Sequence, residues 1–495
     1  MESGLAARNG GRIGLAALVA ILLLGLGLRV GYAWDGRAPV YDARAYAAIA
    51  ASLERGEGFT VGAGATQPSS NYSPGLPLFA AALYEVTGGV HERLARVVLA
   101  LVASLAVLFT YLIGRRLGEA LWTGTGRGGT NWIGGVASGR AVVAGLLGAL
   151  VVAVYPAFLE YGGMLMSEPL AATMLSGAVL AMFWARDAGT GVARRAALAR
   201  WLLAGALLGA LTLVRPEYLA VAVLLAILAS LPAWQSFSLH SVRNDCHGGG
   251  AVLRVGWWRS GFVRGLVMLA GVVVVVAPWT LRNAVALDRF VPVSTGGGQV
   301  LYAGTYLPSD GDPERVGAGV VAEHPEIFAP GDAERLRLEQ ILARLAAHTY
   351  PNAESDRALA QMGREQLWDD VSEEPLEYAG FVATKVGRIW SHGPRDVMRQ
   401  PLWEALHWAL LGLGMLGLGV LLWRRRWQAL AIATVFLSIT AISALLVASP
   451  RRVLVMLPLL VACAGIGAVW GWAQMWKIGP RVSQKRSRYS PASTK

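Results

Sequence analysis

Two carboxylates beside long apolar segments are the side chains of this sequence best placed to do chemistry. Asp42 follows the first apolar run, and Glu168 opens another one. A carboxyl group that is partly removed from water binds a proton more readily, which suits a general base. A simpler role is also open. Asp is a favoured helix N-cap, and the segment Ser167-Glu168-Pro169 reads as an N-cap followed by a first helical turn. The two roles do not exclude each other.

Several arginines lie near the ends of apolar runs on the same predicted side as these carboxylates. Such an arginine can simply extend its charged end to the membrane surface. Arginine also binds phosphate through two parallel hydrogen bonds. A group of them near two carboxylates therefore predicts a pocket for an anionic ligand. The predicted catalytic residues are Asp42 and Glu168, and the predicted substrate-binding residues are Arg29, Arg44, Tyr46, Tyr72, Arg215, Glu217, Arg282, Arg451 and Arg452.

The composition shows which kind of protein must position these residues. Of 495 residues, 55% are hydrophobic and 15% are charged, which leaves too little polar surface for a soluble domain. Many apolar runs reach the roughly 20 residues that a membrane-spanning helix needs. The net charge of +12 comes from short basic clusters between these runs, as the positive-inside rule expects, so nucleic acid is not a predicted partner. The sequence predicts an all-α, multi-pass integral membrane protein.

About ten membrane spans are expected from apolar length, oriented by the Lys and Arg positions. Both termini are predicted to be cytoplasmic in a plasma membrane. The first run is long for a signal peptide and lacks a clear cleavage site, so an uncleaved helix is preferred. The predicted spans are about 13–32, 94–112, 141–158, 168–184, 201–214, 218–231, 265–279, 403–423, 428–447 and 453–476.

The remaining segments divide the chain into parts. A first outer loop, 35–92, carries two predicted interfacial helices at 47–53 and 74–86 and belongs to a transmembrane catalytic module, 1–283. An outer region, 284–402, shows helical spacing at 333–347 and 356–368. The C-terminal helices, 403–476, precede a basic tail, 477–495, that is predicted to be disordered. The glycine-rich connector 118–139 is expected to be cytoplasmic and poorly structured.

Other patterns support no further chemistry. Cys246 and Cys463 lie in different settings and predict no disulfide, and the irregular spacing of His240 and His247 around Cys246 does not fit zinc. The three glycines at 296–298 lack the Lys-Ser/Thr of a phosphate-binding loop. No metal and no cofactor are expected. The G-x-x-x-G pairs at 205/209 and 467/471 are interpreted as packing faces within the chain.

An ordered set of motifs resembles the bacterial members of the GT-C membrane glycosyltransferases. This superfamily includes protein O-mannosyltransferases and the aminoarabinose transferase that modifies lipid A. The resemblance covers roughly 13–304 and returns weakly at 451–460. The motifs are Leu28-Arg29-Val30, Asp42-x-x-x-Tyr46, Gly56-x-Gly58-Phe59, Tyr72-Ser73-Pro74-Gly75-x-Pro77-Leu78, Ser167-Glu168-Pro169-Leu170, Arg215-Pro216-Glu217 and Pro278-Trp279-x-x-Arg282-Asn283.

The resemblance implies a polyprenyl-phosphate-linked sugar donor, an inverting transfer and a catalytic carboxylate in the first outer loop, which by position is Asp42. Glu168 matches a second acidic motif that is usually Asp. The aminoarabinose transferases have Asp-Glu-x-Arg-Tyr where this chain has Asp42-Ala43-Arg44-Ala45-Tyr46, which argues against the same substrate. The acceptor is left open as a lipid, a glycan or a protein.

The hypothesis that follows has three parts. Arg282 and either Arg451 or Arg452 hold the donor phosphate, Asp42 removes the proton of the acceptor, and polyprenyl phosphate leaves. The alternative is a transporter or flippase of a lipid-linked substrate. Such a protein is expected to carry charges in the middle of its helices, and five of the predicted spans, 141–158, 168–184, 265–279, 428–447 and 453–476, carry almost none. A non-catalytic membrane subunit would leave the clustered charges unexplained.

Overall fold

The computed structural model describes residues 2–35, 42–61, 68–122, 139–187, 194–231, 250–391, 393 and 396–487. Every regular element in these ranges is a helix. Most of the connector 118–139 and the histidines at 240 and 247 lie outside the described residues, so the predictions made for them have no structural counterpart here.

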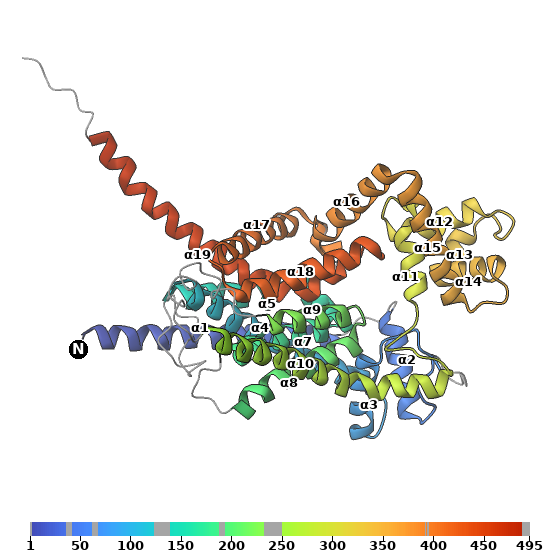
Figure 1. The fold of residues 1–495 in the computed structure, drawn as a ribbon, viewed down its shortest axis with the longest axis horizontal. Helices are drawn as coiled ribbons and strands as arrows, with labels where there is room; N and C mark the ends of the chain where they lie inside the picture. The colour runs from blue at the N-terminus through green and yellow to red at the C-terminus, as the bar shows by residue number, and fades with distance from the viewer. Residues whose placement is uncertain are drawn as a thin grey trace, which may run out of the picture.

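The bundle contains all of the predicted apolar segments in helical form (Figure 1). In the described part of the chain, eight helices are long and apolar enough to cross a membrane, and a bent pair makes up to nine. Helix α9 follows the same pattern but has only 13 residues. The bundle helices are α1 (Glu2–Asp35), α4 (Glu92–Trp122), α5 (Gly139–Val154), α7 (Ser167–Arg186), α8 (Arg194–Val214), α9 (Tyr218–Ser230), α10 (Gly250–Leu287), α17 (Pro401–Trp423), α18 (Trp427–Leu445) and α19 (Arg451–Ser487).

One predicted span is wrong in its shape. The expected continuous helix over 141–158 breaks at Tyr155, and α6 (Pro156–Gly162) continues at 51° to α5. Proline has no N–H, so Pro156 cannot bond the carbonyl of Val152 four residues earlier. Arg29 of α1 replaces that bond: its Nη2 donates to Val152 O at 2.6 Å and its Nη1 to Ala153 O at 3.1 Å. The side chain of Arg29 thus completes a broken helix.

Two helices form the centre of the bundle. In both α7 and α19, 83% of the residues in the most apolar 18-residue stretch are buried. The corresponding share is 22% in α1, at the periphery. Close approach depends on glycine: a Cβ on Gly205 would overlap Met268 O of α10, and one on Gly467 would overlap Leu413 O of α17. These contacts confirm that both G-x-x-x-G pairs include packing faces within the chain. α19 also runs on to Ser487, into the segment predicted to be disordered.

The two predicted interfacial helices are present as α2 (Asp42–Glu54) and α3 (Gly75–Thr87). They lie at the end of the bundle opposite the N-terminus (Figure 1), which we call the distal end. The predicted outer region also lies there, and we call its folded part, residues 297–399, the cap region. Its elements are α11 (Gly297–Thr305), η2 (Leu307–Ser309), α12 (Pro313–Glu323), α13 (Asp332–Arg335), α14 (Leu338–Thr349), α15 (Ser355–Glu373), α16 (Pro375–Ser391) and η3 (Asp396–Arg399). The helix expected over 333–347 is therefore split into α13 and α14.

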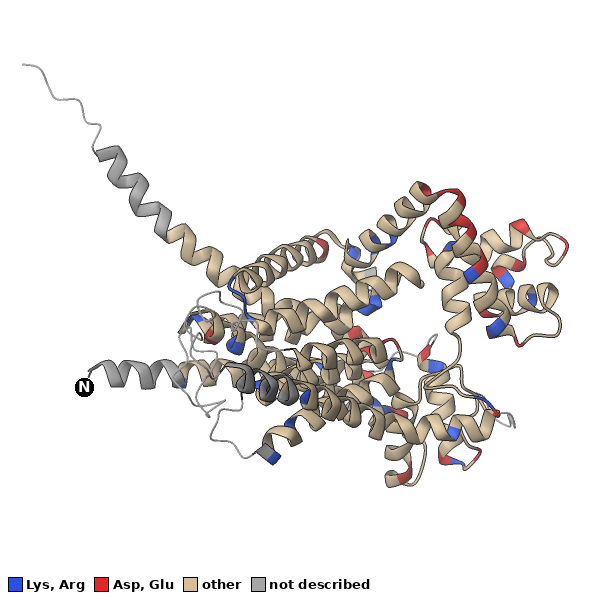
Figure 2. Cartoon of the chain, viewed as in Figure 1, with Lys and Arg blue, Asp and Glu red and all other residues tan. Residues whose placement is uncertain are grey.

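The cap region has a small hydrophobic core of its own, which includes Val316 and Val320 of α12 and Ile341 and Leu345 of α14. Lys385 of α16 joins this region to the bundle. Its Nζ donates to the carbonyl of Gly304 in α11 and, at 2.7 Å, to Ala444 O at the end of α18. Figure 2 shows that charged residues gather toward the ends of the bundle and on the cap region.

Candidate active site

Six charged side chains form an alternating row at the distal end of the bundle. Arg451 bonds two carboxylates: its Nη1 lies 2.9 Å from Asp42 Oδ2 and its Nε 2.6 Å from Glu168 Oε1. Arg215 lies 3.2 Å from the same Glu168 oxygen and 2.8 Å from Glu217 Oε1. Arg452 Nε ends the row at 3.9 Å from Glu217 Oε1. We call the set Asp42, Arg451, Glu168, Arg215, Glu217 and Arg452 the charge network.

Helix ends bring these residues together from distant parts of the sequence. Asp42 begins α2, Arg451 and Arg452 begin α19, and Glu168 lies in the first turn of α7. The prediction that Ser167 caps α7 is wrong, because Met166 is the N-cap residue and makes no side-chain cap. Ser167 Oγ instead accepts a hydrogen bond from Arg215 at 3.4 Å. The first turn of a helix stabilises a carboxylate, which favours Glu168 at this position.

Burial divides the charge network into a fixed inner part and an accessible edge. The Glu168 side chain is 0% exposed, whereas Asp42 is 38% and Arg451 30% exposed. A buried carboxylate needs charged partners, and Glu168 Oε1 has two, Arg451 and Arg215, whereas its Oε2 is buried without a hydrogen-bond partner. Asp42 therefore forms the solvent-facing end of a row whose other members are held from within.

The electrostatic environment shifts the pKa values of three groups between the bundle helices. Burial raises the pKa of Glu217, but the charges of Arg215 and Arg452 outweigh it, so this pKa lies below its usual value. Burial lowers the pKa of Arg215, but Glu217 and Glu168 outweigh it and the net shift is upward. Burial, followed by the charges of Asp42 and Glu168, raises the pKa of Tyr46. Glu217 and Arg215 thus remain charged, and Tyr46 remains neutral.

A cavity of about 470 Å³ lies against the charge network. One wall is charged and includes Asp42, Arg215, Glu217, Arg451 and Arg452. The other wall comes mainly from the cap region and is largely apolar. Its residues are Gln299, Val300, Ala303, Pro313 and Leu338, together with Val447. The cavity can therefore hold a ligand that has both a charged group and an apolar face.

The structure brings together most of the residues predicted from sequence. Tyr46 lines the cavity one helical turn after Asp42, and Tyr72 packs edge-on against Tyr46 with ring centroids 5.8 Å apart. Five predicted residues do not line the cavity. Tyr72 and Glu168 contact residues that do, and the other three are Arg29, Arg44 and Arg282. Arg29 is buried at the bend between α5 and α6, and Arg44 is exposed on α2.

Arg282, which also does not line the cavity, belongs to a neighbouring contact. Its Nη1 donates to Ser69 O at 3.3 Å, and its guanidinium lies 4.9 Å from the ring centre of Trp279 and 5.5 Å from that of Phe59. Through these contacts Arg282 connects the end of α10 to the first outer loop.

Sequence reasoning missed the polar residues Ser73, Gln299 and Ser449, which also line the cavity. Ser73 belongs to the motif that begins at Tyr72, and its position next to a predicted substrate-binding residue was a signal that could have identified it. Gln299 lies shortly after Thr295 in the sequence. The backbone N–H of Thr295 donates to Ser70 O at 2.7 Å and so joins two segments that are distant in the chain. No sequence pattern marks that pairing.

The carboxylates of the charge network are arranged for ion pairing with arginine. In the part of the chain that the structure describes, no three His, Cys, Asp or Glu side chains lie close enough together to hold a metal ion. Asp42 and Glu168 instead share the guanidinium of Arg451. The arrangement suits acid–base chemistry beside a bound anion.

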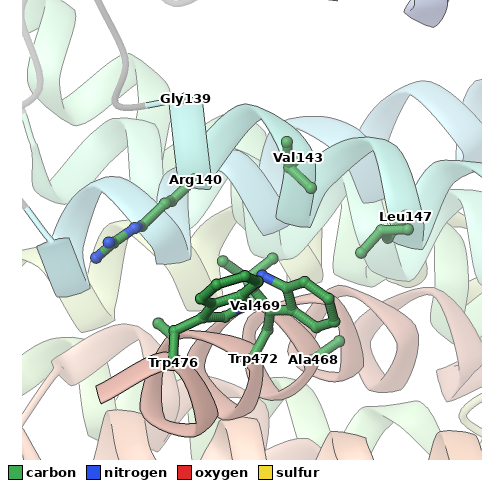
Figure 3. Close-up of a pocket in the computed structure, with 9 residues that line it drawn as sticks. Gly139, Arg140, Val143, Leu147, Ala468, Val469, Trp472 and Trp476 are labelled. Atoms are coloured by element: carbon green, nitrogen blue, oxygen red, sulfur yellow. The ribbon is translucent and has the colours of Figure 1, made fainter. Parts of the chain in front are cut away.

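A second cavity, of about 810 Å³, lies between α5 and α19 near the other end of the bundle (Figure 3). Val143 and Leu147 line it from α5, and Trp472 and Trp476 line it from α19. Arg140 is the one charged residue among the described residues that line it. This apolar groove has no acid–base pair among them, so the distal cavity is the candidate active site.

No model of a known protein family and no curated protein matches the sequence. Solved structures do match. The archaeal oligosaccharyltransferase AglB from Archaeoglobus fulgidus, in complex with an inhibitory peptide and a dolichol-phosphate, has 15% identity and a TM-score of 0.51 over 97% of this chain and 52% of that chain. The apo form of the Archaeoglobus fulgidus oligosaccharyltransferase gives 14% identity and a TM-score of 0.51 over 97% and 53%.

ArnT from Cupriavidus metallidurans bound to undecaprenyl phosphate has 16% identity and a TM-score of 0.35, over 94% of this chain and 80% of that chain. The chain spans about half the length of the oligosaccharyltransferase that it matches. The match to the oligosaccharyltransferase shows a shared fold. The protein is thus a multi-pass membrane protein with the GT-C type of fold, as its sequence motifs predict.

Proposed function

We propose that this protein is a membrane glycosyltransferase that moves a sugar from a polyprenyl-phosphate donor to an acceptor on the extracytoplasmic side of the plasma membrane. The observation that carries the proposal is the position of Asp42. Its carboxylate faces a cavity whose charged wall also presents three arginines, on a fold shared with an oligosaccharyltransferase. A base beside an anion-binding surface is the minimum that such a transfer requires.

The donor phosphate is assigned to the arginines that line the cavity. Arg451 and Arg452 remain from the sequence-based hypothesis, and Arg215 replaces Arg282, whose contacts lie in the first outer loop. Arginine suits a phosphate because its planar fork donates two parallel hydrogen bonds. One similar structure contains a dolichol-phosphate, which supports a polyprenyl phosphate as the lipid carrier. The apolar wall of the cavity fits the non-polar faces of such a substrate.

In the proposed reaction, Asp42 accepts the proton of an acceptor hydroxyl or amine as that group attacks the anomeric carbon. The bond between the anomeric carbon and the phosphate oxygen breaks, and its electron pair stays on the leaving phosphate. Attack opposite to the leaving group inverts the configuration. Glu168 is too deeply buried to touch a substrate, so we assign it the positioning of Arg451.

The test uses purified protein in lipid nanodiscs with a panel of undecaprenyl-phosphate-linked, radiolabelled hexoses and pentoses. Membrane lipid, glycan and protein fractions serve as acceptors. The proposal expects label to pass to one acceptor class with wild-type protein and with Glu57→Gln. Glu57 is a suitable control because it pairs with Arg55 at 2.7 Å, outside the residues that line the cavity.

The same preparation tests the alternative of a transporter or flippase. In sealed liposomes, a flippase would move the lipid-linked sugar between leaflets and leave its bond to the phosphate intact. Movement with no transfer to any acceptor fraction would contradict the proposed function. Analysis of glycans and lipids from a deletion strain would identify the sugar and its acceptor.

A further inference from the structure

We propose that Arg451 exchanges partners during the reaction: it pairs with Asp42 in the resting site and with the donor phosphate once Asp42 has taken up the proton of the acceptor. The inference rests on the proposed function and adds a device that couples the base to the leaving group. The Asp42–Arg451 ion pair of the resting site must therefore break during the reaction.

The two bonds of Arg451 differ in a way that permits such an exchange. Its Nε bonds Glu168, which is 0% exposed, while its Nη1 bonds Asp42, which is 38% exposed at the cavity wall. The inner bond anchors the guanidinium, because breaking it would leave a carboxylate buried with one partner fewer. The outer bond faces the cavity, where an oxyanion of a ligand can compete for the same N–H groups.

The charge balance of the network favours the exchange only after proton transfer. Three carboxylates and three guanidinium groups sum to zero in the resting site. A network with zero net charge attracts a bound anion less strongly than one with a net positive charge does. Protonation of Asp42 leaves the network with one net positive charge, located at the arginine that Asp42 has released.

The step conserves atoms and charge. The acceptor O–H bond breaks and its proton goes to Asp42, which changes from −1 to neutral. The acceptor oxygen forms the new bond to the anomeric carbon, and the bond from that carbon to the phosphate oxygen breaks. The phosphate changes from a diester with one negative charge to a monoester with two. Arg451 is therefore freed from one anion as the neighbouring anion gains charge.

A second observation supports the binding of an anion in the cavity: one hydrogen-bond donor of Arg452 has no acceptor. Arg452 is 8% exposed and lines the cavity, yet its Nε has no hydrogen-bond acceptor. A buried donor without an acceptor is unfavourable and is usually completed by water or by a ligand. Because Arg451 and Arg452 line the same cavity, a phosphate bound there can contact both guanidinium groups.

The experiment measures the affinity of full-length protein in nanodiscs for undecaprenyl phosphate, the class of lipid that the reaction releases. Asp42→Asn reproduces the neutral, proton-bearing carboxyl group. The proposal expects this variant to bind undecaprenyl phosphate about tenfold more tightly than wild type, a coupling typical of side chains in direct contact. Glu57→Gln removes a carboxylate outside the cavity lining and is expected to bind as wild type does.

The decisive comparison repeats Asp42→Asn in an Arg451→Lys background. Lysine keeps the positive charge but lacks the fork that bonds Asp42 and Glu168 together. The proposal expects the effect of Asp42→Asn to fall below about twofold there. An unspecific effect of removing negative charge would persist, because the total charge of the background is unchanged.

Folding of each variant is checked by size-exclusion chromatography and thermal melting. If Arg451→Lys does not fold, the pair Arg451→Gln with Glu168→Gln removes the buried charge together with its partner and serves as the background. Equal affinity of wild type and Asp42→Asn, or an undiminished effect in either background, would overturn the exchange and leave the proposed function standing. Failure of wild type to bind undecaprenyl phosphate would overturn both.

Discussion

The guanidinium of Arg451 lies 2.9 Å from the carboxylate of Asp42, although 409 positions separate them in the chain. Asp42 begins α2 near the N-terminus, and Arg451 begins the last helix of the bundle. Their contact means that the candidate site exists only when the first outer loop and the final helix pack on the same end of the bundle. Glu168, from the middle of the sequence, joins them through the same arginine.

The first prediction concerns Asp42. Asp42→Asn is expected to lower sugar transfer by about 10²- to 10⁴-fold, because a positioned general base contributes on that order. Asp42→Glu keeps a carboxylate on a longer side chain and is expected to retain more activity than the amide. Initial rates at saturating donor and acceptor, with protein quality checked by melting temperature, make the comparison. Transfer by Asp42→Asn at the wild-type rate would remove Asp42 from the mechanism.

The second prediction separates the role of Glu168 from that of Asp42. Glu168→Gln leaves Arg451 and Arg215 without their shared buried carboxylate. Loss of one partner from a buried pair is expected to cost about 3 kcal/mol of folding stability. The melting temperature in detergent should fall for Glu168→Gln and stay unchanged for Glu57→Gln, whose carboxylate is exposed. An unchanged melting temperature with lost activity would instead indicate a direct catalytic role for Glu168.

The bundle itself could be predicted from apolar length and basic clusters because these patterns are local. Asp42 and Glu168 could be predicted for the same reason. Each lies at the start of a helix beside a long apolar run, and this local pattern indicates a helix end on one side of the membrane. Helix ends on one side must meet somewhere, so the convergence of Asp42, Glu168 and Arg451 was within reach of the sequence.

The partners of individual arginines could not be predicted in the same way. Arg29 and Arg282 have the same kind of position as Arg451, yet Arg29 bonds the carbonyls left free by Pro156 and Arg282 bonds the first outer loop. Which role each takes depends on the three-dimensional arrangement of helices and on a bend at Pro156. The apolar wall supplied by Val300 and Leu338 likewise depends on how the cap region folds back over the bundle.

The third prediction concerns Lys385, which is 1% exposed. Burial, with the charge of Arg452 second, lowers the pKa of Lys385 from 10.5 to about 8. Between those pH values the unfolded chain holds a proton that the folded protein has released. Stability is therefore expected to rise as the pH increases from about 8 to 10.5, by about 3 kcal/mol in total. Below pH 8 the lysine is charged in both states, and this contribution no longer changes.

Lys385→Met provides the control for this pH dependence. Other groups, tyrosines above all, also titrate in alkali, so the informative quantity is the difference in melting temperature between wild type and Lys385→Met. That difference is expected to change in favour of wild type as the pH rises. The variant also loses the hydrogen bonds to Gly304 O and Ala444 O, so its cap region should become more sensitive to protease. Parallel pH curves for the two proteins would contradict the assigned pKa.

The fourth prediction uses the two glycines of a single G-x-x-x-G pair in α19. A Cβ on Gly467 would overlap Leu413 O of α17, whereas a Cβ on Gly471 would meet nothing within 4 Å. Gly467→Ala should therefore push α17 and α19 apart and cost about 1–3 kcal/mol, as overpacking does in a well-filled interior. Gly471→Ala adds the same methyl group to the same helix with room for it, and its melting temperature should equal or slightly exceed that of wild type. If this pair served dimerisation, both substitutions would weaken self-association measured by cross-linking, while packing within the chain predicts a loss of stability confined to Gly467→Ala.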